Sequence, residues 1–159
     1  MNEGMTRAYN HSTWQCNAGD PYTADGYRLP TDAEWEYAAQ YNDGRIFLWG
    51  NEALDCSRAN SSSCIGAPVA VGTYPDGMSI LGFYDMTGNV WEWCNDWQVC
   101  DVGTETATDP VGPASAGGRV VHGGSYTHAD SYSRRAGRIS YGQGMCYAYG
   151  GFRVARTQP

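Results

Sequence analysis

The apolar residues of this chain fall into short groups separated by polar and glycine-rich stretches. Only the stretch 31–40 has helical periodicity, because its apolar residues recur at spacings of three and four and so share one face. These residues are Trp35, Ala38 and Ala39. Thr31 and Glu34 have the spacing of a capping box, in which each side chain bonds the backbone N–H of the other residue. The pattern predicts one helix, which begins at Thr31 and ends before the turn at 42–44.

Short runs rich in Val, Ile and aromatic residues predict strands at 69–71, 90–93, 119–122 and 152–156. The stretch 102–118 is rich in Thr, Gly, Pro and Ala, which is typical of a long loop. The sequence has no internal repeat, no heptad pattern and no alternation of strands with helices. We therefore expect an α+β fold with short strands, one clear helix and many loops.

The composition explains how such a chain can fold. Its 159 residues fit a single domain over 1–159, and its 21 Gly and 7 Pro exclude a helical bundle. Leu, Ile, Val and Phe are scarce. The 6 Trp and 12 Tyr can nevertheless build a core from rings, whose N–H and O–H groups then need hydrogen-bond partners.

The net charge of the chain argues against two classes of binding partner. The net charge is −7, and all 10 basic residues are Arg. An acidic surface does not suit a phosphate backbone or an anionic membrane, so we expect neither nucleic acid nor membrane as a partner. No apolar run reaches the roughly 20 residues of a membrane span. The N-terminal stretch also lacks the profile of a signal peptide.

The six cysteines form no CxxC motif, which argues against a zinc ribbon or a thioredoxin-like redox pair. Two local pairs, Cys56 with Cys64 and Cys94 with Cys100, have the spacing of short-loop disulfides. Free buried thiols are the alternative. Paired cysteines would indicate an extracytoplasmic compartment, and the sequence does not otherwise fix the localisation. The three histidines lack metal-site spacing, and we interpret His122 as structural.

Four segments, in this order, resemble one protein family. They are 26–39 (GYRLPTDAEWEYAA), 82–93 (GFYDMTGNVWEW), 119–126 (RVVHGGSY) and 151–156 (GFRVAR). Together they are similar to the formylglycine-generating enzymes, also called sulfatase-modifying factors, whose fold is a variant of the C-type lectin fold. The resemblance covers nearly the whole chain but corresponds to the later part of the family domain. It implies an N-terminally shortened domain, which is either a fragment or a chain whose sheet is completed by another chain, as in a homodimer.

The resemblance also implies a test for catalysis. In the enzymes of this family, two cysteines downstream of a Gly-Gly-Ser motif bind copper(I) and use dioxygen to oxidise a substrate cysteine to formylglycine. The matching positions here are His128 and Ser133. Neither is a cysteine, and a serine is a poor ligand for copper(I). We therefore expect no catalytic residues, no copper and no oxidase activity by this route.

A calcium site is implied by the segment 85–92. The resemblance places Ca²⁺ between the side chains of Asp85 and Glu92 and the backbone carbonyls of Gly88 and Val90. The ligand set is chemically sound, since calcium binds several oxygens and a glycine turn can direct carbonyls inward. The alternative is that Asp85 caps a turn and Glu92 is solvated. We expect a structural Ca²⁺.

A binding pocket is implied by Trp91 and Ser125, which match residues that line the family's substrate pocket. The segment from Tyr126 to Tyr149 mixes Tyr, Ser and Arg, which is typical of an adaptable binding surface. Some C-type lectin-like relatives of the family are binding proteins diversified in this region. The alternative is that these rings form a core. The candidate pocket residues are Trp91, Ser125, Tyr126, His128, Tyr132, Arg134 and Arg138.

The sequence leaves three functional hypotheses. The first is a pseudoenzyme, a calcium-containing domain that binds an unknown small ligand or protein. The second is a formylglycine-generating oxidase that uses a displaced metal site at Cys146 and His128, or a partner subunit. The third is a fragment retained only as a stable fold.

Overall fold

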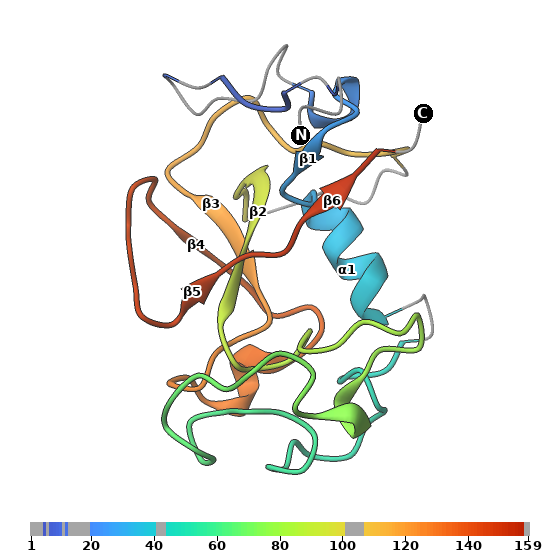
Figure 1. The fold of residues 1–159 in the computed structure, drawn as a ribbon, viewed down its shortest axis with the longest axis vertical. Helices are drawn as coiled ribbons and strands as arrows, with labels where there is room; N and C mark the ends of the chain where they lie inside the picture. Colours follow the sequence, from blue (N-terminus) through green and yellow to red (C-terminus); the bar gives the residue numbers. More distant parts are fainter. Residues whose placement is uncertain are drawn as a thin grey trace.

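The computed structural model describes residues 5, 7–10, 12, 20–40, 44–100 and 107–157. Its centre is a four-stranded sheet with the order β4-β3-β2-β5 (Figure 1). The strands β2, β3 and β4 are antiparallel, and the short β5 runs parallel to β2. Their bounds are Trp91–Trp97 (β2), Arg119–His122 (β3), Arg138–Tyr141 (β4) and Gly150–Gly151 (β5).

Two further strands, β1 (Tyr27–Arg28) and β6 (Ala155–Arg156), form a separate antiparallel pair. The one α-helix of the described residues, α1 (Asp32–Gln40), follows β1. Three 3-10 turns complete the described elements: η2 (Pro21–Thr23), η3 (Pro75–Gly77) and η4 (Asp130–Ser133). In Figure 1 the long loops of 44–90 fill the end of the molecule opposite the β1–β6 pair. No helix within the described part of the chain is long and apolar enough to cross a membrane.

The helix confirms its predicted capping box. The backbone N–H of Glu34 donates to Thr31 Oγ1 at 3.2 Å, and that of Thr31 donates to Glu34 Oε2 at 2.9 Å. The guanidinium of the buried Arg28, in β1, donates two hydrogen bonds of 2.6 and 2.7 Å to the same Glu34 carboxylate. This fork-to-fork pair ties the helix to the small β1–β6 sheet.

The strand predictions have mixed outcomes. The runs at 90–93 and 119–122 are confirmed, and the first extends to Trp97. The run at 152–156 is strand only at its end, in β6. The prediction at 69–71 is wrong, because the side chain of Asn89 bonds the N–H and C=O of Val69 at 3.0 and 3.2 Å in place of a strand partner. Strand β4 was not predicted, and 107–118 is irregular as expected.

The two faces of the central sheet have different environments, since successive strand residues point to opposite sides. One face packs on α1: Trp35 stacks on His122, with ring centroids 4.4 Å apart, and packs with Cys94 and Val120 in the main core. The opposite face carries rings, among them Trp93 of β2 and Tyr141 of β4. The expected helix face is confirmed, because Trp35 and Ala39 are core residues and Ala38 packs against them.

One predicted disulfide forms and the other does not. Cys56 and Cys64 are bonded. Cys94 is instead buried in the core as a free thiol, and Cys100 is exposed, so the predicted pairing of these two is wrong. Closing so short a loop removes entropy from the unfolded chain. We expect the Cys56→Ser/Cys64→Ser double variant to lose about 2 to 3 kcal/mol of unfolding free energy in urea denaturation. An unchanged midpoint would contradict this.

Candidate functional site

A row of aromatic rings lies on the sheet face opposite α1. Trp91 and His128 meet edge to face with centroids 5.5 Å apart, and Tyr132 lies 6.2 and 5.7 Å from these two rings. On the other side of His128, Tyr149 lies at 5.2 Å and stacks on Tyr147 at 4.9 Å. The row continues through Tyr141 to Trp93. We call Trp91, Trp93, His128, Tyr132, Tyr141, Tyr147 and Tyr149 the ring row.

Hydrogen bonds fix the orientation of His128 at the centre of the ring row. Trp91 Nε1 donates to His128 Nδ1 at 3.2 Å, and an indole N–H can only donate. The hydroxyls of Ser125 and Thr127 lie 2.7 and 2.9 Å from the same nitrogen. Burial lowers the pKa of His128, which favours the neutral ring. The ring proton is therefore assigned to Nε2, and Nδ1 is an acceptor.

The structure brings together four of the seven candidate pocket residues: Trp91, Ser125, His128 and Tyr132. The other three, Tyr126, Arg134 and Arg138, do not join them. Tyr126 is tied by its backbone N–H to the carbonyl of Asn89, and Arg134 is an exposed residue at the end of η4. Arg138 lies on the helix-side face, where its guanidinium is 2.7 Å from Asp32. Alternation along β4 explains this, because Arg138 pairs with His122 and Tyr141 with Arg119.

Three rings that the candidate list omitted belong to the ring row: Tyr141, Tyr147 and Tyr149. The composition of the segment 126–149 was the available signal, since it is rich in Tyr. Burial and the neighbouring phenols raise the pKa of Tyr141 to about 12, so its hydroxyl stays a donor. Trp93, at the end of the row, also lines an apolar cavity of about 450 Å³ together with Arg119, Met145 and Phe152.

The two positions that match the family's cysteines carry an engaged imidazole and a buried hydroxyl. His128 Nδ1 is engaged by Trp91 and its neighbours. Ser133 is fully buried, and its hydroxyl has no hydrogen-bond partner among the described residues. Cys146 is an exposed free thiol, and no group of three His, Cys, Asp or Glu residues in the described ranges includes it.

In the predicted calcium loop, the carboxylate of Glu92 is bound by the guanidinium of Arg153, which the sequence did not predict. Asp85, Gly88 and Asn89 all have positive φ, and the side chains of Asp85, Val90 and Glu92 line a cavity of about 400 Å³. One Asp85 oxygen accepts the N–H of Gly72 at 2.7 Å. The buried Glu92 is not solvated: Arg153 binds both of its oxygens, and Trp35 Nε1 donates to it at 2.6 Å. A calcium ion here would share Glu92 with Arg153.

Asp96 is a buried acid beneath the first turn of α1, where it accepts the backbone N–H of Asp32 at 2.9 Å. Burial raises the pKa of Asp96 from 3.8 to about 6. The folded state then binds more protons than the unfolded chain between about pH 4 and 6, so stability falls as the pH rises through this window.

We expect Asp96→Asn to stabilise the protein by about 2 to 3 kcal/mol at pH 7.5, since the amide keeps the acceptor oxygen without the buried charge. Near pH 3 the difference should nearly vanish, because the aspartate is then mostly neutral in both the folded and the unfolded state. Urea unfolding at the two pH values measures both effects. A variant that is less stable than wild type at pH 7.5 would contradict the argument.

Comparison with known proteins identifies the family. The model of the sulfatase-modifying factor enzyme 1-like domain, the FGE-sulfatase family, matches residues 5–158. The chain belongs to this family. The formylglycine-generating enzyme of Streptomyces coelicolor is 41% identical over 123 residues, which cover 69% of this chain and 39% of that protein. The serine/threonine-protein kinase Pkn1 of Chlamydia trachomatis is 39% identical over 134 residues, covering 82% of this chain and 21% of the kinase.

A solved structure has a similar fold. Treponema denticola variable protein 1 superposes with a TM-score of 0.76 and 31% identity, covering 95% of this chain and 54% of that one. The chain therefore has the expected α+β, C-type lectin-like fold, with mixed sheets, long loops and, among the described residues, one α-helix. This chain spans less than half of the length of each of the two curated relatives named above.

Proposed function

We propose that this domain is a non-catalytic binding module that holds a peptide segment of a protein partner on the ring row. The proposal rests on one observation: aromatic rings surround the positions at which the family's enzymes have their two copper-binding cysteines. His128 and Ser133 stand at the two cysteine positions, and the rings of Trp91, Tyr132 and Tyr149 surround His128.

A row of rings suits an extended chain. Phenol and indole rings offer large, rigid contact areas with a polar tip, and they lose little conformational entropy on binding. Tyr132 is 45% exposed, so it is accessible at one end of the row. The apolar cavity beside Trp93 offers a recess for one side chain at the other end.

The binding experiment starts from a random peptide library displayed on phage and selected on the immobilised chain. Affinities of the enriched peptides are then measured by calorimetry for wild type, Tyr132→Ala and the matched control Tyr27→Ala. Tyr27 is 60% exposed but lies on β1, outside the ring row. We expect at least tenfold weaker binding by Tyr132→Ala and no change for Tyr27→Ala. No enriched peptide, or equal losses in both variants, would overturn the proposal.

The oxidase hypothesis predicts a different result. Under it, the purified chain with copper(I) and dioxygen would convert a sulfatase-type cysteine peptide to the aldehyde, which mass spectrometry detects. We expect no conversion. Conversion that is lost in Cys146→Ala would establish the displaced site, and conversion of any kind would refute the non-catalytic proposal.

The proposed calcium site predicts a thermal shift. Calcium at about one hundred times its dissociation constant would add about 2.7 kcal/mol, which raises Tm by roughly 5 to 10 °C in a domain of this size. Asp85→Asn keeps an acceptor for Gly72 and tolerates the left-handed backbone, but it removes one charge. We expect it to reduce the shift by more than half. Scanning fluorimetry in calcium and in chelator measures this, and an equal Tm in both would refute the site.

The proposed homodimer rests on the short strand β5 at one edge of the central sheet. A sheet edge can be completed by another chain. A native mass spectrum in calcium should show a dimer with one calcium per chain. A monomer at micromolar concentration would refute the dimer, and the peptide-binding proposal would stand.

A further inference from the structure

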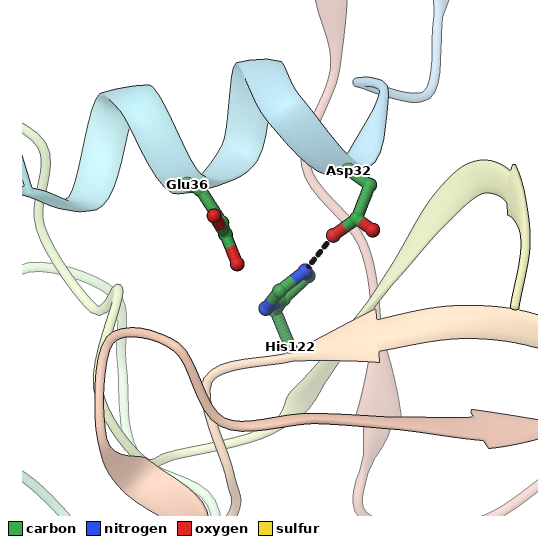
Figure 2. A group of neighbouring side chains, drawn as sticks. All are labelled: Asp32, Glu36 and His122. Atoms are coloured by element: carbon green, nitrogen blue, oxygen red, sulfur yellow. Dashed lines mark hydrogen bonds and ion pairs between the residues drawn. The ribbon is translucent and has the colours of Figure 1, made fainter. Parts of the chain in front are cut away.

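A second group of polar side chains lies on the other face of the sheet, between α1 and β3. Asp32 and Glu36 stand one helical turn apart on α1, and His122 rises towards them from β3 (Figure 2). One ligand atom from each residue lies within 4.8 Å of the other two. The sequence does not reveal this group, because Asp32 and His122 are 90 positions apart and only the fold brings them together.

Two features of this group are unsatisfied. His122 is 0% exposed, and its Nε2 contacts Asp32 Oδ1 while its Nδ1 has no hydrogen-bond partner among the described residues. In Figure 2 this second nitrogen lies on the Glu36 side of the ring. A buried polar atom without a partner costs about 1 to 3 kcal/mol, so such atoms often mark an unseen ligand. The carboxylate of Glu36, which is half-buried, likewise makes no hydrogen bond or ion pair within the described part of the chain.

We infer that Asp32, Glu36 and His122 bind a divalent zinc ion. One imidazole and two carboxylates are ligands of the type that zinc prefers, and three protein ligands leave the fourth tetrahedral position for water. Calcium is disfavoured, because it takes oxygen ligands. Around a tetrahedral zinc the ligand atoms lie about 3.4 Å from one another, so Glu36 would move closer to His122, and Asp32 Oδ1 would move away from the Nε2 that it now contacts. Glu36 can supply this movement, since no hydrogen bond holds it.

The surroundings of the site offer access and negative charge. A cavity of about 760 Å³ is lined by Asp32, Glu36, Asp96 and Arg138, so water and metal can reach the carboxylates. Three acids therefore face one guanidinium. Arg138 binds Asp32 Oδ2 at 2.7 Å and Val99 O at 3.4 Å, and Asp32 Oδ1, the oxygen that would bind the metal, now contacts His122 Nε2. Arg138 would then orient the ligating carboxylate from outside the metal shell.

The test uses the full chain with Cys16, Cys100 and Cys146 replaced by serine, so that zinc cannot bind these side chains, and with calcium at saturation. Zinc binding is measured by calorimetry. The variant Glu36→Gln removes one ligand that no other residue holds, so the fold is retained. Asp76→Asn is the matched control, because Asp76 is an exposed acid outside the site.

We expect one zinc per chain, binding at least tenfold weaker in Glu36→Gln, and unchanged binding in Asp76→Asn. In ¹⁵N NMR spectra, zinc should move the ring nitrogen signals of His122. The site is refuted if wild type binds no zinc at 1 mM, if Glu36→Gln binds as well as wild type, or if the His122 signals do not move. This inference does not rest on the proposed peptide-binding surface, which lies on the opposite sheet face and is tested separately.

Discussion

Replacing Glu92 with glutamine is expected to lower the free energy of unfolding by about 3 to 5 kcal/mol. Glu92 is buried, and its carboxylate joins Trp35 of α1 to Arg153 near the C-terminus. The amide keeps an acceptor for the indole N–H, but its NH₂ group then faces the guanidinium donors of Arg153. The guanidinium is left without a counter-charge, and this uncompensated charge accounts for most of the loss. Urea unfolding at pH 7 measures the effect.

The matched control is Glu52→Gln. Glu52 also pairs with an arginine, Arg58, but the pair is 3.8 Å apart and Glu52 is 69% exposed. An exposed pair of this kind contributes at most about 1 kcal/mol. Replacing both Glu92 and Arg153 with leucine should recover part of the loss, because no charge then remains unpaired. Equal effects of Glu92→Gln and Glu52→Gln would show that the buried pair is not a structural link.

Gly88→Ala is expected to lower the free energy of unfolding by about 2 to 5 kcal/mol. Gly88 has φ +75°, and a Cβ atom there would lie 2.4 Å from the carbonyl oxygen of Asn60. Two backbone hydrogen bonds hold the loop in this position. The N–H of Asn89 donates to the Asn60 oxygen at 2.8 Å, and the N–H of Gly88 donates to Gly123 O at 2.7 Å. A left-handed residue with a side chain costs roughly 1 to 2 kcal/mol, and the clash with rigid backbone adds about 1 to 3 more.

Gly72→Ala separates these two contributions. Gly72 has nearly the same φ, +76°, but a Cβ atom there meets nothing within 4 Å. We expect this variant to lose only about 1 to 2 kcal/mol, the cost of the conformation alone. The difference in urea midpoint between the two variants then reports the close approach of Gly88 to Asn60. Equal losses would mean that the loop moves to accept the methyl group.

Local signals explain the parts of the fold that the sequence predicted. Thr31 and Glu34 bond each other in the chain, so their spacing alone predicted the helix start. The strand at 119–122 has a run of Val between polar ends. The wrong strand at 69–71 depended on the side chain of Asn89, twenty positions away, which no local pattern reveals. Strand β4 was missed because only one of its four residues, Ile139, is aliphatic.

For the candidate sites too, the sequence predicted what depends on local motifs and missed what depends on distant residues. Trp91, Ser125 and His128 were predicted from positions that match the family in two separate segments, and they do meet. The place of Arg138 depended on the pleat of an unpredicted strand, so it was assigned to the wrong face. His122 was interpreted as structural because no histidine spacing suggested a metal, and its carboxylate neighbours come from a distant helix.

The alternation of residues along β2 and β3 has a consequence for how this domain can change over generations. Odd and even positions of the same strands serve two separate surfaces, so a substitution on the ring side leaves the residues that face the helix in place. Selection can therefore vary the rings from one descendant to the next while the packing on α1 is inherited unchanged. A fold with this layout lets recognition diverge without a matching loss of stability.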